Sequence, residues 1–179
     1  MVRYVALLYS ITLSRERRLK MADWLHVLEG VGVERPRTLL STGNAVFDAE
    51  GAGIRKLERR LEDAFEQAFG RRIDTIVRTA AAFRKLAAAN PFPDETARDP
   101  GHVAVRMMRE PIGDAAFAAL AERASPREKV ALVDGDLWIY TPEPPGKSRV
   151  VAMLSRERSG VGTIRAWSTV RRIGEMLED

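Results

Sequence analysis

Two tight-turn signals constrain the fold of this chain more than any other feature. Thr42-Gly43-Asn44 and Asp134-Gly135 each predict a β-hairpin, because glycine and asparagine tolerate the positive φ angles of such turns. Around each hairpin the hydrophobic pattern reads strand, helix, hairpin, helix, strand. Since this order occurs twice within 179 residues, the sequence predicts two successive α+β units.

The first unit contains the clearest helix of the chain. Ile54, Leu61 and Phe69 lie on one apolar stripe, and Gly70 ends the helix. Within it the run Glu58–Asp63, with acidic residues among arginines, predicts a solvated face. The predicted strands of this unit are Val2–Tyr9, Arg37–Ser41, Ala45–Asp48 and Arg72–Arg78, and the predicted helices are Leu19–Leu28 and Ile54–Phe69.

The second unit repeats the order after a connector. Thr79–Ala89 is predicted to be helical, and Asp94–Gly101 is polar and turn-rich, which marks the boundary. A terminal helix follows the last strand, with Ser168 as its predicted N-cap. The predicted strands are His102–Met108, Lys129–Val133, Leu137–Tyr140 and Gly162–Ala166, and the predicted helices are Asp114–Ala124, Lys147–Arg158 and Ser168–Leu177.

These elements predict an α+β fold of two tandem ferredoxin-like βαββαβ units with a linking helix and a C-terminal helix. The predicted domains are residues 1–78, a helical connector at 79–100, and residues 101–179. The first strand is apolar on both sides, with Val5 and Leu7 opposite Tyr4 and Leu8, so both sheet faces are predicted to be covered.

The composition excludes several classes of protein. The chain has no cysteine, which rules out disulfides, thiol nucleophiles and cysteine-based zinc sites. The short apolar start reads as a strand rather than a signal peptide, and no stretch approaches the ~18 apolar residues of a membrane span. The sequence therefore predicts a cytoplasmic protein that does not contact a membrane. Its basic residues are mainly arginine, but a net charge of +4 is weak support for a nucleic-acid partner.

One segment resembles the end of a phosphate-binding loop. Gly146-Lys147-Ser148 follows a predicted strand and opens a predicted helix, but the complete motif has a glycine where this chain has Thr141. Nucleotide hydrolysis is therefore disfavoured. The sequence leaves open either simple anion binding by Lys147 and Ser148 at the helix start or a plain helix cap.

Arg165 and Trp167 stand where the chain leaves its last strand. Their planar cation and stacking surface suit a base or another flat anion, while the alternative is that Trp167 packs the terminal helix onto the sheet. His26 and His102 are far apart in sequence and have no ligand spacing, so no metal site is predicted.

Several short motifs together resemble the bacterial domain-of-unknown-function family numbered 1697. They are Tyr4-Val5-Ala6-Leu7-Leu8, Lys20-Met21, Arg37-Thr38-Leu39, Gly43-Asn44-Ala45-Val46-Phe47, Asn90-Pro91-Phe92-Pro93 and Arg165-Ala166-Trp167-Ser168-Thr169-Val170. The resemblance implies a duplicated α/β fold and no established activity, so it supplies no catalytic residues. Lys20, Gly43 and Asn44 are further ligand- or anion-binding candidates, although the hairpin by itself explains Gly43 and Asn44. At Tyr9–Arg15 the chain departs from the family, because a glycine-rich loop expected there is missing.

The sequence favours a non-catalytic binding or interaction module that works without a cofactor. Self-association or a protein partner is then expected. Nucleic-acid binding is the second hypothesis, although Phe47 is the lone aromatic residue of its strand and an open stacking surface is not expected. A small-molecule enzyme with scattered polar groups is the third.

Overall fold

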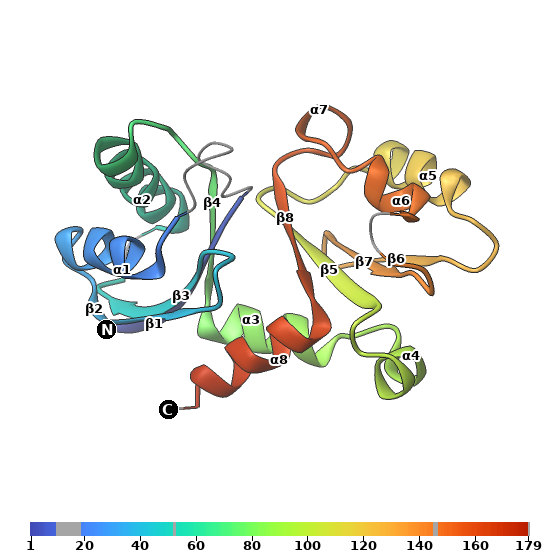
Figure 1. The fold of residues 1–179 in the computed structure, drawn as a ribbon, viewed down its shortest axis with the longest axis horizontal. Coiled ribbons are helices and arrows are strands. Elements are labelled where there is room, and N and C mark those ends of the chain that lie inside the picture. Colours follow the sequence, from blue (N-terminus) through green and yellow to red (C-terminus); the bar gives the residue numbers. More distant parts are fainter. Residues whose placement is uncertain (10–18, 52, 145–146, 179) are drawn as a thin grey trace. The chain divides into compact units, whose positions relative to one another are not determined.

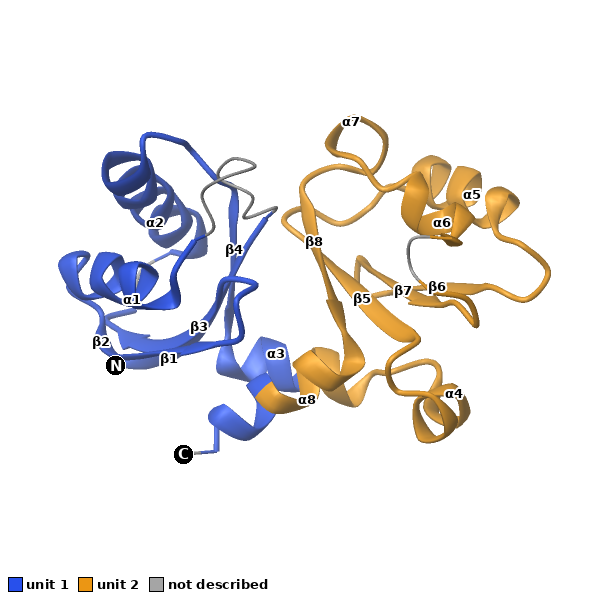
Figure 2. Ribbon diagram, viewed as in Figure 1, with its two compact units in different colours: residues 1–85, 173–179 blue, residues 86–172 orange. Residues whose placement is uncertain are grey.

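Two four-stranded antiparallel sheets with helices make up the fold, as the ribbon in Figure 1 shows. The computed structural model describes residues 1–9, 19–51, 53–144 and 147–178. The chain divides into two compact units, with residues 1–85 and 173–179 in the first and residues 86–172 in the second (Figure 2). The division falls within the helix that follows the first sheet. The predicted α+β class is therefore confirmed.

Unit 1 holds the first sheet, whose strands lie in the order β2-β3-β1-β4. Helices α1 and α2 lie on one face of this sheet (Figure 1). The elements are β1 (Val2–Leu8), α1 (Met21–Gly30), β2 (Glu34–Leu39), β3 (Asn44–Ala49), α2 (Ile54–Phe69), β4 (Thr75–Thr79) and α3 (Ala80–Ala88).

Aromatic side chains fill the core of unit 1 between the sheet and its two helices. Trp24 of α1 and Phe65 of α2 are fully buried, with their ring centroids 5.7 Å apart. Phe47 of β3 packs into the same cluster and is 1% exposed. The stripe of α2 predicted from the sequence therefore forms the centre of this core.

The outer edge of β4 is closed by two carboxylates of α2. Glu58 and Glu62 are 2% and 4% exposed, and they accept hydrogen bonds from the backbone N–H groups of Val77 at 3.1 Å and Thr75 at 3.0 Å. The prediction of a solvated face here is wrong for these two residues. Helical spacing of four places both carboxylates over the same strand, and only the tertiary fold supplies the donors that justify their burial.

Unit 2 holds the second sheet, whose strands lie in the order β6-β7-β5-β8. This order corresponds strand by strand to that of unit 1. The elements are α4 (Pro93–Arg98), β5 (Val103–Met108), α5 (Asp114–Arg123), β6 (Lys129–Val133), β7 (Asp136–Tyr140), α6 (Arg149–Ala152), α7 (Arg156–Ser159), β8 (Gly162–Ala166) and α8 (Trp167–Met176), the last of which ends in unit 1.

The helical layer of unit 2 is less regular than predicted. The sequence predicted one helix over Lys147–Arg158, but the structure has two single turns, α6 and α7. Ser148 and Ser155 each accept a backbone hydrogen bond from the residue three positions on, so each begins a new helix. The core beneath is correspondingly open, since Val151 and Leu154 are only partly buried.

Other predicted boundaries shift for local reasons. Asp94–Gly101 was predicted to be turns, but Pro93 starts the short helix α4, where its missing N–H is harmless. Ser168 is not an N-cap, because β8 continues directly into α8. The strand predicted at Arg72–Arg78 is Thr75–Thr79, and the strand predicted at Arg37–Ser41 is Glu34–Leu39.

Both faces of each sheet contain buried side chains. Val5 and Leu7 of β1, which alternate with the residues facing α1 and α2, are fully buried. Val103, Val105 and Met107 of β5 are buried in the same way. The prediction that neither sheet presents an open apolar face agrees with this burial.

Removing one of the carboxylates that close the edge of β4 is expected to destabilise unit 1. Glu62→Ala leaves the N–H of Thr75 without that acceptor and should cost about 1.5–3 kcal/mol, while Glu62→Gln keeps an acceptor oxygen and should cost less. Urea unfolding and amide exchange at Thr75 would measure both effects. Gln67→Ala, an exposed change on the same helix, serves as the control, and equal stability of the two alanine variants would contradict the prediction.

Candidate functional site

Gly43 and Asn44, two of the predicted binding residues, hold the first hairpin together. A Cβ at position 43, where φ is +72°, would lie 2.7 Å from the Cβ of Leu8. The buried Asn44 side chain donates to the carbonyl of Leu39 at 2.9 Å and to Oγ1 of Thr42 at 2.8 Å. Asn44 is the first residue of β3 rather than part of the turn itself. Both residues thus have structural roles that account for their presence.

Ser148, predicted to help bind an anion, is hydrogen bonded to the chain's own carboxylate. Its Oγ donates to Glu128 and accepts from the N–H of Val151, so it caps α6. Glu128 also accepts from the N–H of Ser125 at 2.8 Å. Lys147 next to it is exposed. An internal anion therefore lies where the sequence suggested that an external one would bind.

The environment of Glu128 favours its charged form. Burial alone would raise its pKa, but hydrogen bonds from the hydroxyl of Ser148 and from the backbone of Ser125 and Val150 outweigh that effect. The pKa of Glu128 is consequently below its usual value.

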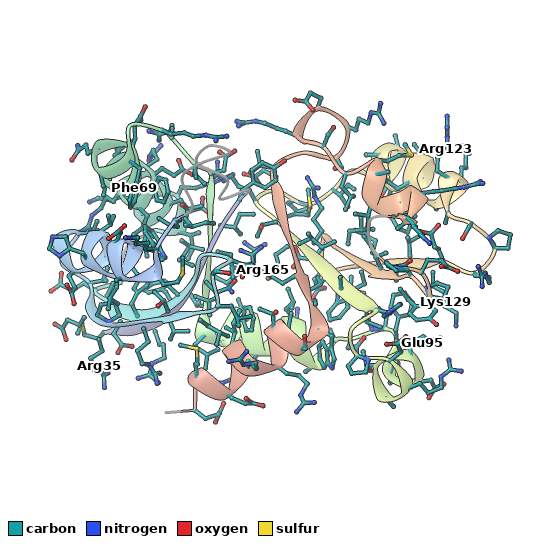
Figure 3. All side chains as sticks on the ribbon, in the orientation of Figure 1. Arg35, Phe69, Glu95, Arg123, Lys129 and Arg165 are labelled. Carbon is teal, nitrogen blue, oxygen red and sulfur yellow. The ribbon has the colours of Figure 1, made fainter. Side chains whose placement is uncertain are left out.

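Arg165 and Trp167 belong to one face of the second sheet. Val105 pairs with both Trp138 and Arg165, so these three side chains project on the same side. Arg165, labelled in Figure 3, is 7% exposed and donates to Oγ1 of Thr163 at 2.7 Å. Burial lowers its pKa to about 10, so it stays charged at neutral pH. The ring centroids of Trp167 and Trp138 lie 5.8 Å apart. This contact agrees with the alternative that Trp167 packs the terminal helix onto the sheet.

The remaining predicted residues are not gathered into a site. Lys20 is exposed just before α1, where its carbonyl accepts from the N–H of Trp24 at 3.2 Å. Tyr9–Arg15, where the chain departs from the family, lies outside the described residues except for Tyr9. Within the described part of the chain, no group of three or more His, Asp or Glu side chains is placed to hold a metal ion.

A cavity of about 300 Å³ lies within unit 2, between two loops and the first turn of α5. The loop from β5 to α5 supplies one wall, and the loop from α7 to β8 supplies the other. Its lining residues are Arg109, Glu110, Pro111, Ile112, Gly113, Ala116, Arg158, Ser159, Gly160 and Val161. The walls are thus largely apolar, and the charged groups are two arginines and one glutamate.

One backbone bond and one side-chain bond hold the loop from α7 to β8 against the end of β5. The N–H of Arg109 donates to the carbonyl of Val161 at 2.8 Å, and the buried Arg106 donates to the carbonyl of Gly160 at 2.7 Å. At Gly162 a Cβ would lie 2.5 Å from the sulfur of Met108, so a larger residue there would have to displace that side chain. The cavity is therefore a defined feature of this unit.

The start of α5 opens into this cavity. Its N-cap is Gly113, and no side chain there accepts a hydrogen bond from the first turn. The N–H groups of such a turn carry a partial positive charge. The sequence alone does not reveal this cavity, because Gly160-Val161-Gly162 is typical of a turn and nothing in the chain order pairs it with residues 109–116.

Comparison with known proteins identifies the family. The sequence profile described as "Protein of unknown function (DUF1697)" matches residues 1–138 of the chain. The chain belongs to this family. The resemblance predicted from short motifs is thereby confirmed. No curated protein matches the chain.

A solved structure shares the fold of this DUF1697 member. It is described as the structure of conserved bacterial protein SP0830 from Streptococcus pneumoniae. The alignment covers 100% of this chain and 99% of the other with a TM-score of 0.75, and the two sequences are 21% identical. At that identity the likeness concerns the fold alone. Within the described residues, no helix combines the length and apolar character needed to span a membrane.

The cap formed by Glu128 and Ser148 should make the stability of this protein depend on pH. Because the pKa of Glu128 is lower in the folded chain than in the unfolded chain, its contribution is complete above the unfolded value of about 4.3 and is lost as pH falls through the folded value. Between pH 6 and pH 3 the melting temperature of wild type should therefore fall more than that of Glu128→Gln. Glu122→Gln, an exposed change in the same unit, should follow wild type, and parallel curves for all three proteins would refute the link.

Proposed function

We propose that this protein is a non-catalytic binding module and that its ligand occupies the cavity of unit 2. The observation that carries the proposal is the cavity itself, with largely apolar walls and with Arg109 and Arg158 among its lining residues. Concave, mostly apolar sites with a few convergent polar groups are the usual form of ligand sites.

The lining favours a small organic anion. Arginine offers planar, permanently charged donors that match carboxylates and phosphates. The first turn of α5, which has no side-chain cap and contains the acidic Asp114, lies beside them, and Pro111 and Ile112 supply apolar surface for the rest of the ligand. A volume of about 300 Å³ suits a fragment-sized group rather than a nucleotide.

Binding is favoured over catalysis by the chemistry of the lining. Arginine does not exchange protons near neutral pH, so Arg109 and Arg158 are poor acid–base groups. The hydroxyl of Ser159 donates to the carbonyl of Ser155 at 2.9 Å, which closes the turn of α7 rather than aiming at the cavity. Glu110 is the remaining ionisable group of the lining, and it is exposed.

The same proposal extends to the architecture, which we interpret as two tandem ferredoxin-like units that arose by duplication. The two sheets have matching strand orders, and matching backbone bonds close them: Tyr9 donates to Asp74 at 2.9 Å in unit 1, and Arg109 donates to Val161 at 2.8 Å in unit 2. Aligning the strand registers also places Arg78 and Arg165 at equivalent positions. The predicted division into residues 1–78, 79–100 and 101–179 belongs to this interpretation.

The expected setting of the protein is the bacterial cytoplasm. Absence of cysteine and the family resemblance support that expectation. A protein partner or a second copy of the chain fits a module without catalytic groups.

A panel of matched fragments would test binding in the cavity. Benzoate and hexanoate, compared with benzamide and hexanamide, should bind wild type with roughly millimolar to micromolar dissociation constants in ligand-observed NMR. Ala116→Leu fills the cavity and should weaken binding at least about tenfold, because it removes the space that the fragment occupies.

Ala119→Leu is the matched control, since Ala119 is exposed on the same helix and does not line the cavity. It should bind fragments as wild type does. If no member of the panel binds, or if both leucine variants bind equally, the cavity is not the ligand site.

A further inference from the structure

We propose that the cavity of unit 2 receives the C-terminal carboxylate of an extended peptide that adds as a strand to the outer edge of β8. This inference rests on the proposed function, because it names the occupant of the same cavity. The carboxylate is that of a peptide C-terminus.

The register of β8 shows which of its N–H groups point outward. Arg109 and Val161 are a hydrogen-bonded pair, because the N–H of Arg109 donates to the carbonyl of Val161 at 2.8 Å. Such pairs alternate along an antiparallel ladder, so Thr163 is the next residue bonded to β5. The N–H groups of Gly162 and Ile164 therefore point away from β5.

Unit 1 shows what happens to the equivalent groups when they have acceptors. There the same bond, from Tyr9 to Asp74, directs the N–H groups of Thr75 and Val77 outward, and carboxylates of α2 accept both. Helix α2 lies along β4, which places these carboxylates beside the edge of the strand. At the β4 edge of unit 1, the N–H groups of Thr75 and Val77 are therefore not available to a further strand.

Among the described residues of the second unit, no helix lies along β8 in the way that α2 lies along β4. Here α6 and α7 are single turns, and neither lies along β8 as α2 lies along β4. Among the turn, loop and cap backbone hydrogen bonds of the described residues, none has the N–H of Gly162 or Ile164 as its donor. Ile164 and Ala166 are partly exposed. An edge with outward N–H groups is a template for strand addition.

The direction of the added strand connects this edge to the cavity. An antiparallel strand on β8 runs from Ala166 toward Gly162, so its C-terminus approaches Gly160 and Val161, which line the cavity. At about 3.3 Å per residue, the two residues from Gly162 to Gly160 span roughly 7 Å. The peptide carboxylate thus arrives at the cavity within about two residues of its last bond to β8.

The lining suits the end of such a peptide. A carboxylate is attracted by Arg109, Arg158 and the first turn of α5, whereas a parallel strand would bring an ammonium group to the same arginines. Pro111 and Ile112 then receive the last side chain, which is expected to be apolar. Main-chain pairing supplies affinity, and the chain end supplies specificity.

Two peptide pools would test the inference. A pool of octapeptides with random sequence but a final Leu or Val is prepared with a free C-terminal carboxylate and, separately, with a C-terminal amide. Immobilised wild-type protein should enrich members of the free-acid pool only. For the enriched peptides, fluorescence anisotropy should show that amidation and Arg158→Gln each weaken binding at least about tenfold, because each removes one side of a charged hydrogen bond.

Arg123→Gln is the matched control, because Arg123 lies at the far end of α5 from the cavity and is labelled in Figure 3. It should leave peptide affinity unchanged. Strand pairing has its own readout: bound peptide should slow amide exchange at Ile164 at least about tenfold without slowing it at Val77. Methylating peptide N–H groups that pair with β8 should abolish binding, while methylating the alternate ones should not.

The outcomes separate the two proposals. If carboxylate fragments bind the cavity but no peptide protects Ile164, or if amides bind as well as acids, the peptide inference is wrong and the ligand site remains. If neither fragments nor peptides bind, both proposals fail. Free-acid selectivity together with protection at Ile164 would support the inference.

Discussion

The backbone N–H groups at the outer edge of each sheet set the main structural constraint in this protein. In unit 1 the glutamates Glu58 and Glu62 of α2 accept those of Val77 and Thr75, which fixes the helix over the edge strand β4. The aromatic core beneath α2 depends on that position, because Phe65 projects from the same helix. Two buried carboxylates thus link the sheet edge to the core.

Unit 2 has the same strand order, but none of its described helices lies along the edge strand as α2 does in unit 1. Its second helical segment is divided by two serine caps into α6 and α7, so no long helix covers β8. The shorter layer leaves several apolar side chains partly exposed and leaves a cavity beside the start of α5. The same strand order therefore supports one unit in which a long helix lies along the β4 edge and another with a cavity beside the start of α5, and the proposed ligand site belongs to the second.

At Ser148, a segment that resembles a phosphate-binding loop is hydrogen bonded to a carboxylate of the same chain. The hydroxyl of Ser148 donates to Glu128, and backbone N–H groups nearby reinforce the charge on that carboxylate. The hydroxyl of Ser148, a donor that could attract a phosphate, is therefore already engaged. This internal ion also ties the loop before β6 to the start of α6, two segments 20 residues apart in sequence.

The sequence by itself determined the order of the strands, the two hairpins and the apolar stripe of α2, because periodicity and turn chemistry depend on neighbouring residues. It also predicted a structural role for Gly43 in the hairpin, and the close approach of Leu8 to this residue is consistent with that role. Only the tertiary structure decided that Glu58 is buried and that residues 109–116 and 158–161 enclose a cavity. The physical reason is that burial and cavities result from packing between segments that are distant in the chain. Local sequence patterns do not predict that packing.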